Sequence, residues 1–178
     1  MLQVNLTPFP ELVTKRLLLR QLIVEDAEEI FQLRSDEKVN EFLDRLRATS
    51  IDDARQFIDK IITAQNKGDG VMWAITLKDD SKLIGTIVYW NMVKERYEAE
   101  VGYELLPQWH GKGIMQEALS TVIEYGFKNL GLKTIMADPK AANQRSINLL
   151  EKTGFVKKGA TDNGYLIYEL KSNLFFPK

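Results

Sequence analysis

Apolar residues along the chain follow two different periods, and the order in which these periods alternate predicts the order of the elements. Strand-like runs are expected at 16–22, 71–77, 83–90, 97–106 and 134–137, with a closing hairpin that turns at 162–164. Helical spacing is expected at 24–35, 38–44, 51–65, 112–130 and 143–153. The order β-α-α-α-β-β-β-α-β-α-β-β is typical of an α/β (α+β) fold, with a mixed, mostly antiparallel sheet of six to seven strands and helices on both faces.

Composition narrows the class of protein. The chain has 178 residues, 44% of them hydrophobic, which is enough for one core, so we expect a single domain over 1–178. Lys and Arg number 24 against 25 Asp and Glu, which leaves no chain-wide positive field, and no direct nucleic-acid binding is expected. With no cysteine and one histidine, no metal site is expected either. No signal peptide and no apolar run near the roughly 20 residues of a membrane span are visible, which favours a cytoplasmic protein without membrane contact.

The segment Gln108-Trp-His-Gly-Lys-Gly113 lies between a predicted strand and a long amphipathic helix. The first turn of a helix exposes unpaired N–H groups and a partial positive charge. Gly111 and Gly113 remove the Cβ atoms that would hinder a phosphate, and Lys112 adds a cation. The segment therefore predicts a pyrophosphate site at the carboxyl end of the 97–106 strand, and a turn that merely starts a helix is the alternative.

This segment resembles the Q/R-x-x-G-x-G/A signature of the GNAT superfamily of N-acetyltransferases. Segments 100–107 and 143–155, together with the opening 14–36, resemble its bacterial subgroup that acetylates ribosomal-protein N-termini (RimJ/RimL type). The resemblance covers nearly the whole chain and implies a GNAT-like sheet and an acyltransferase that uses acetyl-CoA (coenzyme A) as co-substrate. It implies that the signature binds the coenzyme A pyrophosphate, with contacts at Gln108, Gly111, Lys112, Gly113, Ile114 and Met115.

Acetyl transfer to an amine needs a proton acceptor, donors for the developing oxyanion and an acid for the departing thiolate. The two-residue period of a strand places Glu100 and Glu104 on one face. The resemblance implies that a glutamate of this strand acts as the base, directly or through water; we prefer Glu100, with Glu104 second, and a solvated strand face is the alternative. The resemblance also implies an oxyanion contact at a backbone N–H near Leu105 or Leu106.

Further site residues follow from the resemblance alone. It implies that Asn143 contacts the pantetheine arm and that Ser146 is the acid beside the thioester sulfur; a helix N-cap and a first-turn residue are the plain alternatives. His110 stands at a variable position of the signature and is expected to be a partly exposed turn residue. Pro139 replaces the usual apolar β-former, so the strand that starts at 134 is expected to end by Asp138.

The acceptor is the least determined feature. An α-amine, with a pKa of about 7.7–8.0, is partly neutral near neutral pH, whereas a lysine at about 10.4 is almost fully protonated. A protein N-terminus therefore needs the weakest base and is the preferred acceptor. A small amine (polyamine, amino acid or aminoglycoside) and a non-catalytic acyl-CoA-binding module are the alternatives. Homodimers are the commonest closed assemblies, and the resemblance implies that this fold often forms them.

Overall fold

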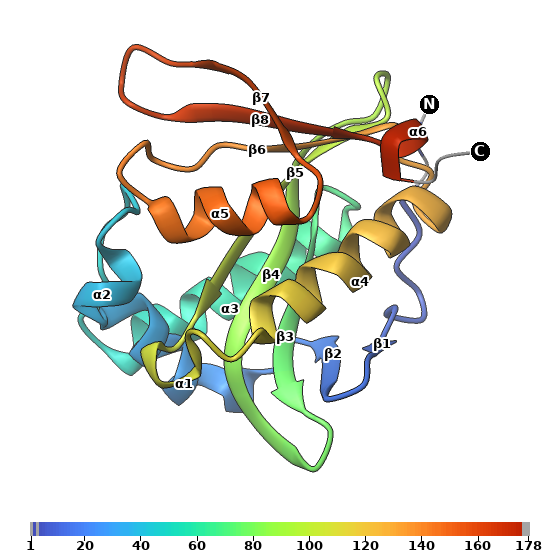
Figure 1. Cartoon of the computed structure of the whole chain (residues 1–178). Helices are drawn as coiled ribbons and strands as arrows, with labels where there is room; N and C mark the ends of the chain where they lie inside the picture. The colour runs from blue at the N-terminus through green and yellow to red at the C-terminus, as the bar shows by residue number, and fades with distance from the viewer. Residues whose placement is uncertain (1, 3, 176–178) are drawn as a thin grey trace.

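An open eight-stranded sheet, in the order β1-β2-β3-β4-β5-β6-β8-β7, forms the centre of the computed structural model, which describes residue 2 and residues 4–175 (Figure 1). Among the strands of these described residues, only β5 and β6 pair in parallel. The predicted fold class is confirmed, and the additional strand arises because Leu12–Val13 pairs with β2. The strands are β1 (Leu12–Val13), β2 (Leu17–Gln21), β3 (Val71–Leu77), β4 (Asp80–Val93), β5 (Glu98–Leu105), β6 (Thr134–Ala137), β7 (Val156–Ala160) and β8 (Leu166–Lys171).

Helices cover both faces of the sheet, with α4 and α5 on one face and α1 to α3 on the other (Figure 1). The helices are η1 (Val24–Asp26), α1 (Ala27–Ser35), α2 (Glu37–Asn40), α3 (Ile51–Asn66), η2 (Pro107–Trp109), α4 (Ile114–Lys128), α5 (Gln144–Lys152) and α6 (Ser172–Phe175). The single domain predicted over 1–178 stays a prediction, and its residues 1, 3 and 176–178 lie outside the described part.

The helix predicted at 38–44 is wrong in length, because α2 ends at Asn40. The Asn40 side-chain amide donates to the carbonyl oxygens of Leu33 (2.9 Å) and Asp36 (2.7 Å), which ties the end of α2 back to α1. Residues 41–50 then form a connecting segment without helix or strand. This segment, which we call the 41–50 loop, matters below because it borders the site.

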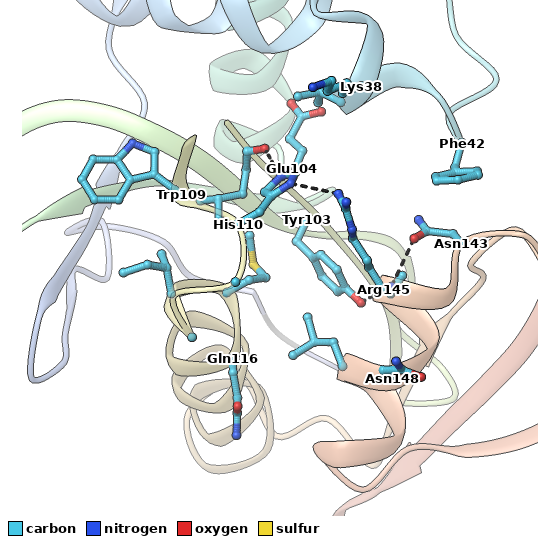
Figure 2. Close-up of a pocket in the computed structure, with 18 of the residues that line it drawn as sticks. Lys38, Phe42, Tyr103, Glu104, Trp109, His110, Gln116, Asn143, Arg145 and Asn148 are labelled. Atoms are coloured by element: carbon cyan, nitrogen blue, oxygen red, sulfur yellow. Dashed lines mark hydrogen bonds between the residues drawn. The ribbon is translucent and has the colours of Figure 1, made fainter. Parts of the chain in front are cut away.

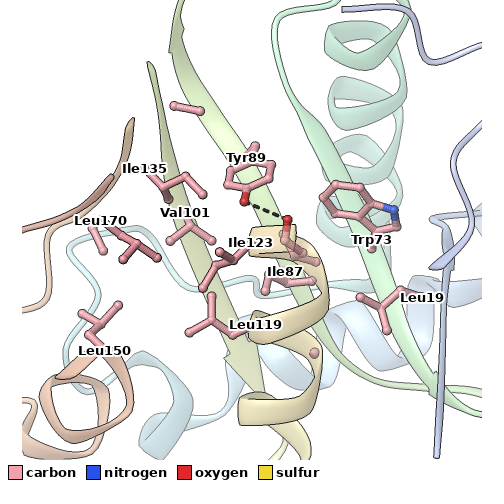
Figure 3. Packing of buried hydrophobic residues seen from close by; sticks show 14 of the residues in the cluster. Leu19, Trp73, Ile87, Tyr89, Val101, Leu119, Ile123, Ile135, Leu150 and Leu170 are labelled. Atoms are coloured by element: carbon pink, nitrogen blue, oxygen red, sulfur yellow. Dashed lines mark hydrogen bonds between the residues drawn. The ribbon is translucent and has the colours of Figure 1, made fainter. Parts of the chain in front are cut away.

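Two apolar clusters hold the layers together. One lies between the sheet and helices α4 and α5, and Figure 3 shows Leu119 and Ile123 of α4 packed over Ile87 and Val101 of the sheet. The other lies between the sheet and helices α1 and α3. Both helical layers are therefore fixed to the same sheet, and elements from both of them can frame one site.

β5 and β6 pair over three positions only, from Glu98–Thr134 to Glu100–Met136. β6 ends at Ala137, two residues before Pro139, as the sequence predicted. The second half of β5, residues 101–105, therefore continues beside β4, and no strand of the described residues pairs with its other side, because β5 and β6 diverge there (Figure 1). The chain leaves this open end of β5 through η2 and enters α4.

Candidate active site

A cavity of about 700 Å³ lies beside the open end of β5, between the start of α4, the start of α5 and the segment that follows α2 (Figure 2). It brings together eight of the residues predicted from the sequence. These are Glu104, Leu105, Gly111, Gly113, Ile114, Met115, Asn143 and Ser146.

Four predicted residues do not line this cavity. Leu106 and Gln108 line a neighbouring hollow, together with Asp36 and Lys38. Glu100 and Lys112 are outside the described linings of both. The Lys112 ammonium instead lies 4.7 Å from the centre of the Trp109 ring.

The start of α4 has the geometry of an anion site. Gly111 and Gly113 have φ angles of +73° and +71°, in the left-handed region that favours glycine. Gly113 is the N-cap and offers no side-chain cap, and the first bond within the helix runs from Glu117 N–H to the Gly113 carbonyl (3.1 Å). The N–H groups ahead of Glu117 are consequently free of helical partners, and they form the positive end of the helix dipole. This arrangement suits a diphosphate.

A contact that the sequence did not predict braces this turn. Glu117, in the first turn of α4, accepts hydrogen bonds from the Thr14 hydroxyl (2.5 Å) and the Arg16 backbone N–H (2.8 Å), and its other oxygen pairs with Arg16 Nε (2.7 Å). Arg16 Nη1 also donates to the Lys112 carbonyl (2.9 Å). Burial alone would raise the pKa of Glu117, but the hydrogen bonds from Thr14 and Arg16 outweigh it and hold the pKa below its ordinary value. The partners are about a hundred residues apart, so no local pattern could have revealed them.

The peptide groups at the end of β5 divide between β4 and the cavity. Leu106 N–H donates to the Ile84 carbonyl (2.9 Å), so this amide is already used by β4. Neighbouring residues of a strand direct their peptide groups to opposite edges. The N–H and C=O of Leu105 therefore point away from β4, toward the gap where β6 no longer pairs. Of the two amides suggested for the oxyanion, that of Leu105 faces the gap.

Two hydroxyls meet inside the cavity. Tyr103 Oη lies 2.8 Å from Ser146 Oγ, and burial raises the pKa of Tyr103 to about 12, so its phenol stays protonated. Asn143 caps α5 by accepting from Ser146 N–H (3.1 Å), while its side-chain NH2 takes no part in this cap (Figure 2). The sequence missed Tyr103 because the strand period places it on the same face as the buried Val101 and Leu105.

The two candidate bases lie on one face of β5, as predicted, in different surroundings. Glu104 lines the cavity, with its side chain 9% exposed, and is paired with Arg45 Nη2 (2.7 Å) of the 41–50 loop. Glu100 accepts from Asn91 Nδ2 (2.9 Å). Burial raises the pKa of Glu100, and the nearby Asp138 carboxylate adds to this effect, although the Asn91 hydrogen bond opposes it. Only Glu104 is in a position to face a ligand of the cavity.

His110 is a partly exposed turn residue, as predicted. Its Nε2 lies 2.8 Å from the Leu105 carbonyl oxygen, and its Nδ1 lies 3.2 Å from Arg145 Nη1. Over residues 2 and 4–175, no group of three His, Cys, Asp or Glu side chains could hold a metal ion. Within the same residues, no helix is long and apolar enough to cross a membrane.

Comparisons with known proteins agree with these features. Residues 16–156 match the family described as the acetyltransferase (GNAT) domain. An uncharacterized N-acetyltransferase of Bacillus subtilis (strain 168), YoaA, is 37% identical over 151 residues, which are 85% of each chain. The ribosomal protein uS5-alanine N-acetyltransferase of Escherichia coli (strain K12) is 32% identical over 102 residues, 57% of this chain and 53% of that enzyme.

A solved structure has the same fold. RimL, the ribosomal L7/L12 α-N-protein acetyltransferase in complex with coenzyme A, superposes with a TM-score of 0.81 and 20% identity over 90% of this chain and 96% of that chain. The family match, the identity to named N-acetyltransferases and the shared fold agree with the motifs in the sequence. The chain therefore belongs to the GNAT family and is an N-acetyltransferase.

Proposed function

We propose that the protein transfers the acetyl group of acetyl-CoA directly to a primary amine, and that the preferred acceptor is the α-amine of a protein N-terminus. The observation that supports this most is the convergence on one cavity of an uncapped glycine helix start, the open peptide edge at Leu105 and the Tyr103–Ser146 hydroxyl pair. The names of two relatives, an enzyme for uS5 alanine and RimL in complex with coenzyme A, favour the same cofactor and acceptor. A ribosomal acceptor would also make the enzyme cytoplasmic.

The cofactor is held at two places in this proposal. The N–H groups of residues 111–115 bind the diphosphate, with Gly111 and Gly113 allowing close approach and Lys112 contributing charge. Asn143 and Leu105, which line the cavity, border the pantetheine arm, and Leu106 and Gln108 lie in the neighbouring hollow. The thioester then lies beside Leu105 and Ser146.

Each residue at the reacting end has one task. The neutral amine forms the new N–C bond at the thioester carbonyl carbon, and the carbonyl electron pair moves to oxygen, where the Leu105 N–H donates to it. Glu104, directly or through water, takes the proton that the amine nitrogen loses. The electron pair on the oxygen then re-forms the C=O bond as the C–S bond breaks with its electron pair on sulfur, and the Ser146 hydroxyl delivers a proton to that sulfur. Tyr103 then donates its proton to Ser146. Solvent reprotonates Tyr103 and removes the proton from Glu104.

The structure favours Glu104 over Glu100 as the base because Glu104 alone lines the cavity. Glu104 is ion-paired with Arg45. A carboxylate base suits an α-amine, because part of the α-amine is already neutral near neutral pH. A lysine side chain, which is almost fully protonated there, is the less suitable acceptor.

The charges around the cavity also bear on the acceptor. Lys38, Arg145 and Lys152 line it, and Glu104 is the sole carboxylate among its described lining residues. Since Arg45 already neutralises Glu104, a polyamine or an aminoglycoside would meet excess positive charge. The cavity therefore favours an acceptor with one amine.

Free-thiol release from acetyl-CoA tests this function. The acceptors are peptides with free α-amines, single amino acids, spermidine and an aminoglycoside, and calorimetry measures coenzyme A binding in parallel. We expect measurable binding and fastest release with peptides, and a Ser146→Ala variant about 100-fold slower in kcat than an Asn148→Ala control on the same helix. Absence of coenzyme A binding would refute the proposed cofactor site. Binding without turnover would favour a non-catalytic acyl-CoA-binding module. Faster turnover with spermidine than with peptides would refute the proposed N-terminal acceptor.

A further inference from the structure

His110 touches three walls of the cavity at once. It belongs to the glycine turn before α4, its Nε2 contacts the end of β5 at the Leu105 carbonyl (2.8 Å), and its Nδ1 contacts Arg145 in the first turn of α5 (3.2 Å) (Figure 2). Neither the glycine signature nor the chemistry proposed above needs a histidine at this position. Its contacts therefore call for a separate explanation.

The two partners of His110 select one protonation state. A carbonyl oxygen can only accept a hydrogen bond, so Nε2 must carry a proton. A guanidinium can only donate, so Nδ1 must present its lone pair to Arg145. Both contacts are satisfied together by the neutral Nε2–H tautomer and by no other form of the ring.

The Leu105 carbonyl is the group that most needs this donor. Leu106 N–H donates to Ile84 on β4, so the N–H and C=O of Leu105 both point to the opposite edge, where β6 has stopped pairing with β5. An uncovered carbonyl dipole beside the Leu105 N–H would repel the negative charge that develops on a thioester oxygen bound there. A donor on that carbonyl removes the repulsion.

We infer that His110 is a positioning residue for acetyl transfer: its Nε2–H covers the Leu105 carbonyl and leaves the adjacent Leu105 N–H as the donor to the oxyanion, while Arg145 fixes the tautomer. This inference rests on the proposed function, because it assigns the oxyanion to Leu105. His110 acts through Leu105 and does not itself exchange protons with the substrate. His110 therefore stabilises the transition state, in which the negative charge on the thioester oxygen is largest, and does not contribute to cofactor binding.

The first test reads the tautomer without any turnover. The chain contains a single histidine, so ¹⁵N-histidine labelling gives one pair of ring-nitrogen signals with no ambiguity of assignment. At neutral pH we expect the Nε2–H form in the wild type and a mixture of tautomers in Arg145→Ala, which removes the donor to Nδ1. A wild type with the proton on Nδ1, or with freely exchanging tautomers, overturns the inference even if the enzyme is active.

The second test separates kcat from KM. His110→Ala removes the donor, whereas the side-chain amide of His110→Gln offers an N–H near the position of Nε2. We expect His110→Ala to lower kcat on the order of tenfold with little change in the KM for acetyl-CoA, and His110→Gln to recover most of the loss. A change confined to KM, equal losses in both variants or no loss in either would overturn the inference.

The two tests keep this inference separate from the proposed function. If the wild type releases no thiol with any amine, the proposed function fails, and the tautomer measurement still decides whether His110 holds the Leu105 carbonyl. If His110→Ala does not fold, as its thermal midpoint would reveal, the comparison of His110→Gln with the wild type and the tautomer of the wild type remain decisive.

Discussion

Glu104 and Glu100 lie four residues apart on one face of β5, and the atoms around each of them differ. Glu104 faces the cavity and is held by Arg45, which is itself held by a hydrogen bond from its Nε to Asn40 Oδ1 (2.7 Å). Glu100 is held by Asn91 outside the cavity. A base needs access to the amine before its basicity matters, so location decides between them.

Glu104→Gln is accordingly expected to lower kcat/KM about 100-fold or more, because the amide cannot take a proton. Glu100→Gln is the matched control and is expected to leave the rate close to that of the wild type. Steady-state thiol release with a peptide acceptor measures both. A larger loss in Glu100→Gln would return the role of base to Glu100, the residue first preferred from the sequence.

Glu117 gives the turn before α4 a dependence on pH. Its pKa lies below the ordinary value in the folded protein, so its contacts with Thr14 and Arg16 stabilise the fold above the unfolded-state pKa of about 4.3, and this contribution disappears as pH falls through the lower folded-state pKa. Glu117→Gln should cost about 1 kcal/mol at neutral pH, a small value because the Arg16 side chain is 43% exposed. Urea unfolding at neutral pH and below pH 4 checks this, and a difference from wild type that persisted in acid would contradict it.

The roles of single residues could be predicted from the sequence where a local motif contains them. They could not be predicted where segments that are distant in the sequence come into contact. The strand period correctly put Glu100 and Glu104 together, but it also placed Tyr103 with the core residues, although its hydroxyl reaches Ser146 in the cavity. Periodicity describes which face a side chain occupies. It does not describe what a different element brings to that face.

Among the elements, the start of α4 has a local conformation that we propose serves a ligand. Gly113 and Gly131 have nearly equal φ angles of +71° and +73°, at the start of α4 and in the turn that follows it. An alanine at either position would carry similar backbone strain, on the order of 1 kcal/mol. Only at Gly113 would its Cβ stand among the N–H groups that we assign to the diphosphate.

Gly113→Ala and Gly131→Ala should therefore lower the stability by similar amounts, whereas only Gly113→Ala should weaken coenzyme A binding. Calorimetry and urea unfolding on both variants separate the two effects. Equal affinity in the two variants would show that the diphosphate is bound elsewhere.

Element types were predictable because most segments have one clear period, and element ends were less so. The helix predicted at 38–44 stops at Asn40, whose side chain bonds back to Leu33 and Asp36 in preference to continuing the helix. The result is the 41–50 loop, which supplies Arg45 to Glu104. An apolar pattern cannot foresee such a competition between a side chain and the helix backbone.

At the scale of the molecule, the packing of α4 on the sheet depends on a glycine, Gly126, which has no side chain. Gly126 lies under the fully buried Tyr89, and a Cβ there would stand 2.5 Å from Tyr89 Oη, which donates to the Val122 carbonyl (2.9 Å). The contact joins the helix layer to the middle of the sheet (Figure 3). Helix and strand are therefore closer here than any larger residue would permit.

Gly126→Ala should cost about 2 kcal/mol by overpacking, although alanine favours a helix elsewhere. Tyr89→Phe removes the clashing oxygen, so the double variant Tyr89→Phe/Gly126→Ala should lose less stability than the sum of the two single variants. Urea unfolding of the four proteins measures this coupling. Additive losses would mean that the clash is relieved by other movements.

The overall topology followed from the sequence because strand–helix–strand units tend to form parallel pairs, and β5 and β6 do so around the glycine turn. The contact of Arg16 with Glu117 and that of Asp44 with Lys140 and Tyr165 join segments about a hundred residues apart. Only the folded chain reveals these contacts.

The two outer strands of the sheet limit how copies of this protein can associate. β1 has two residues, and β7 carries the exposed Lys157 and Lys158 beside an irregularity in its pairing with β8. Short or lysine-bearing borders of this kind discourage a neighbouring molecule from adding its own strand. Any dimer of this protein is therefore expected to form through its helices and loops, with each subunit keeping a separate sheet.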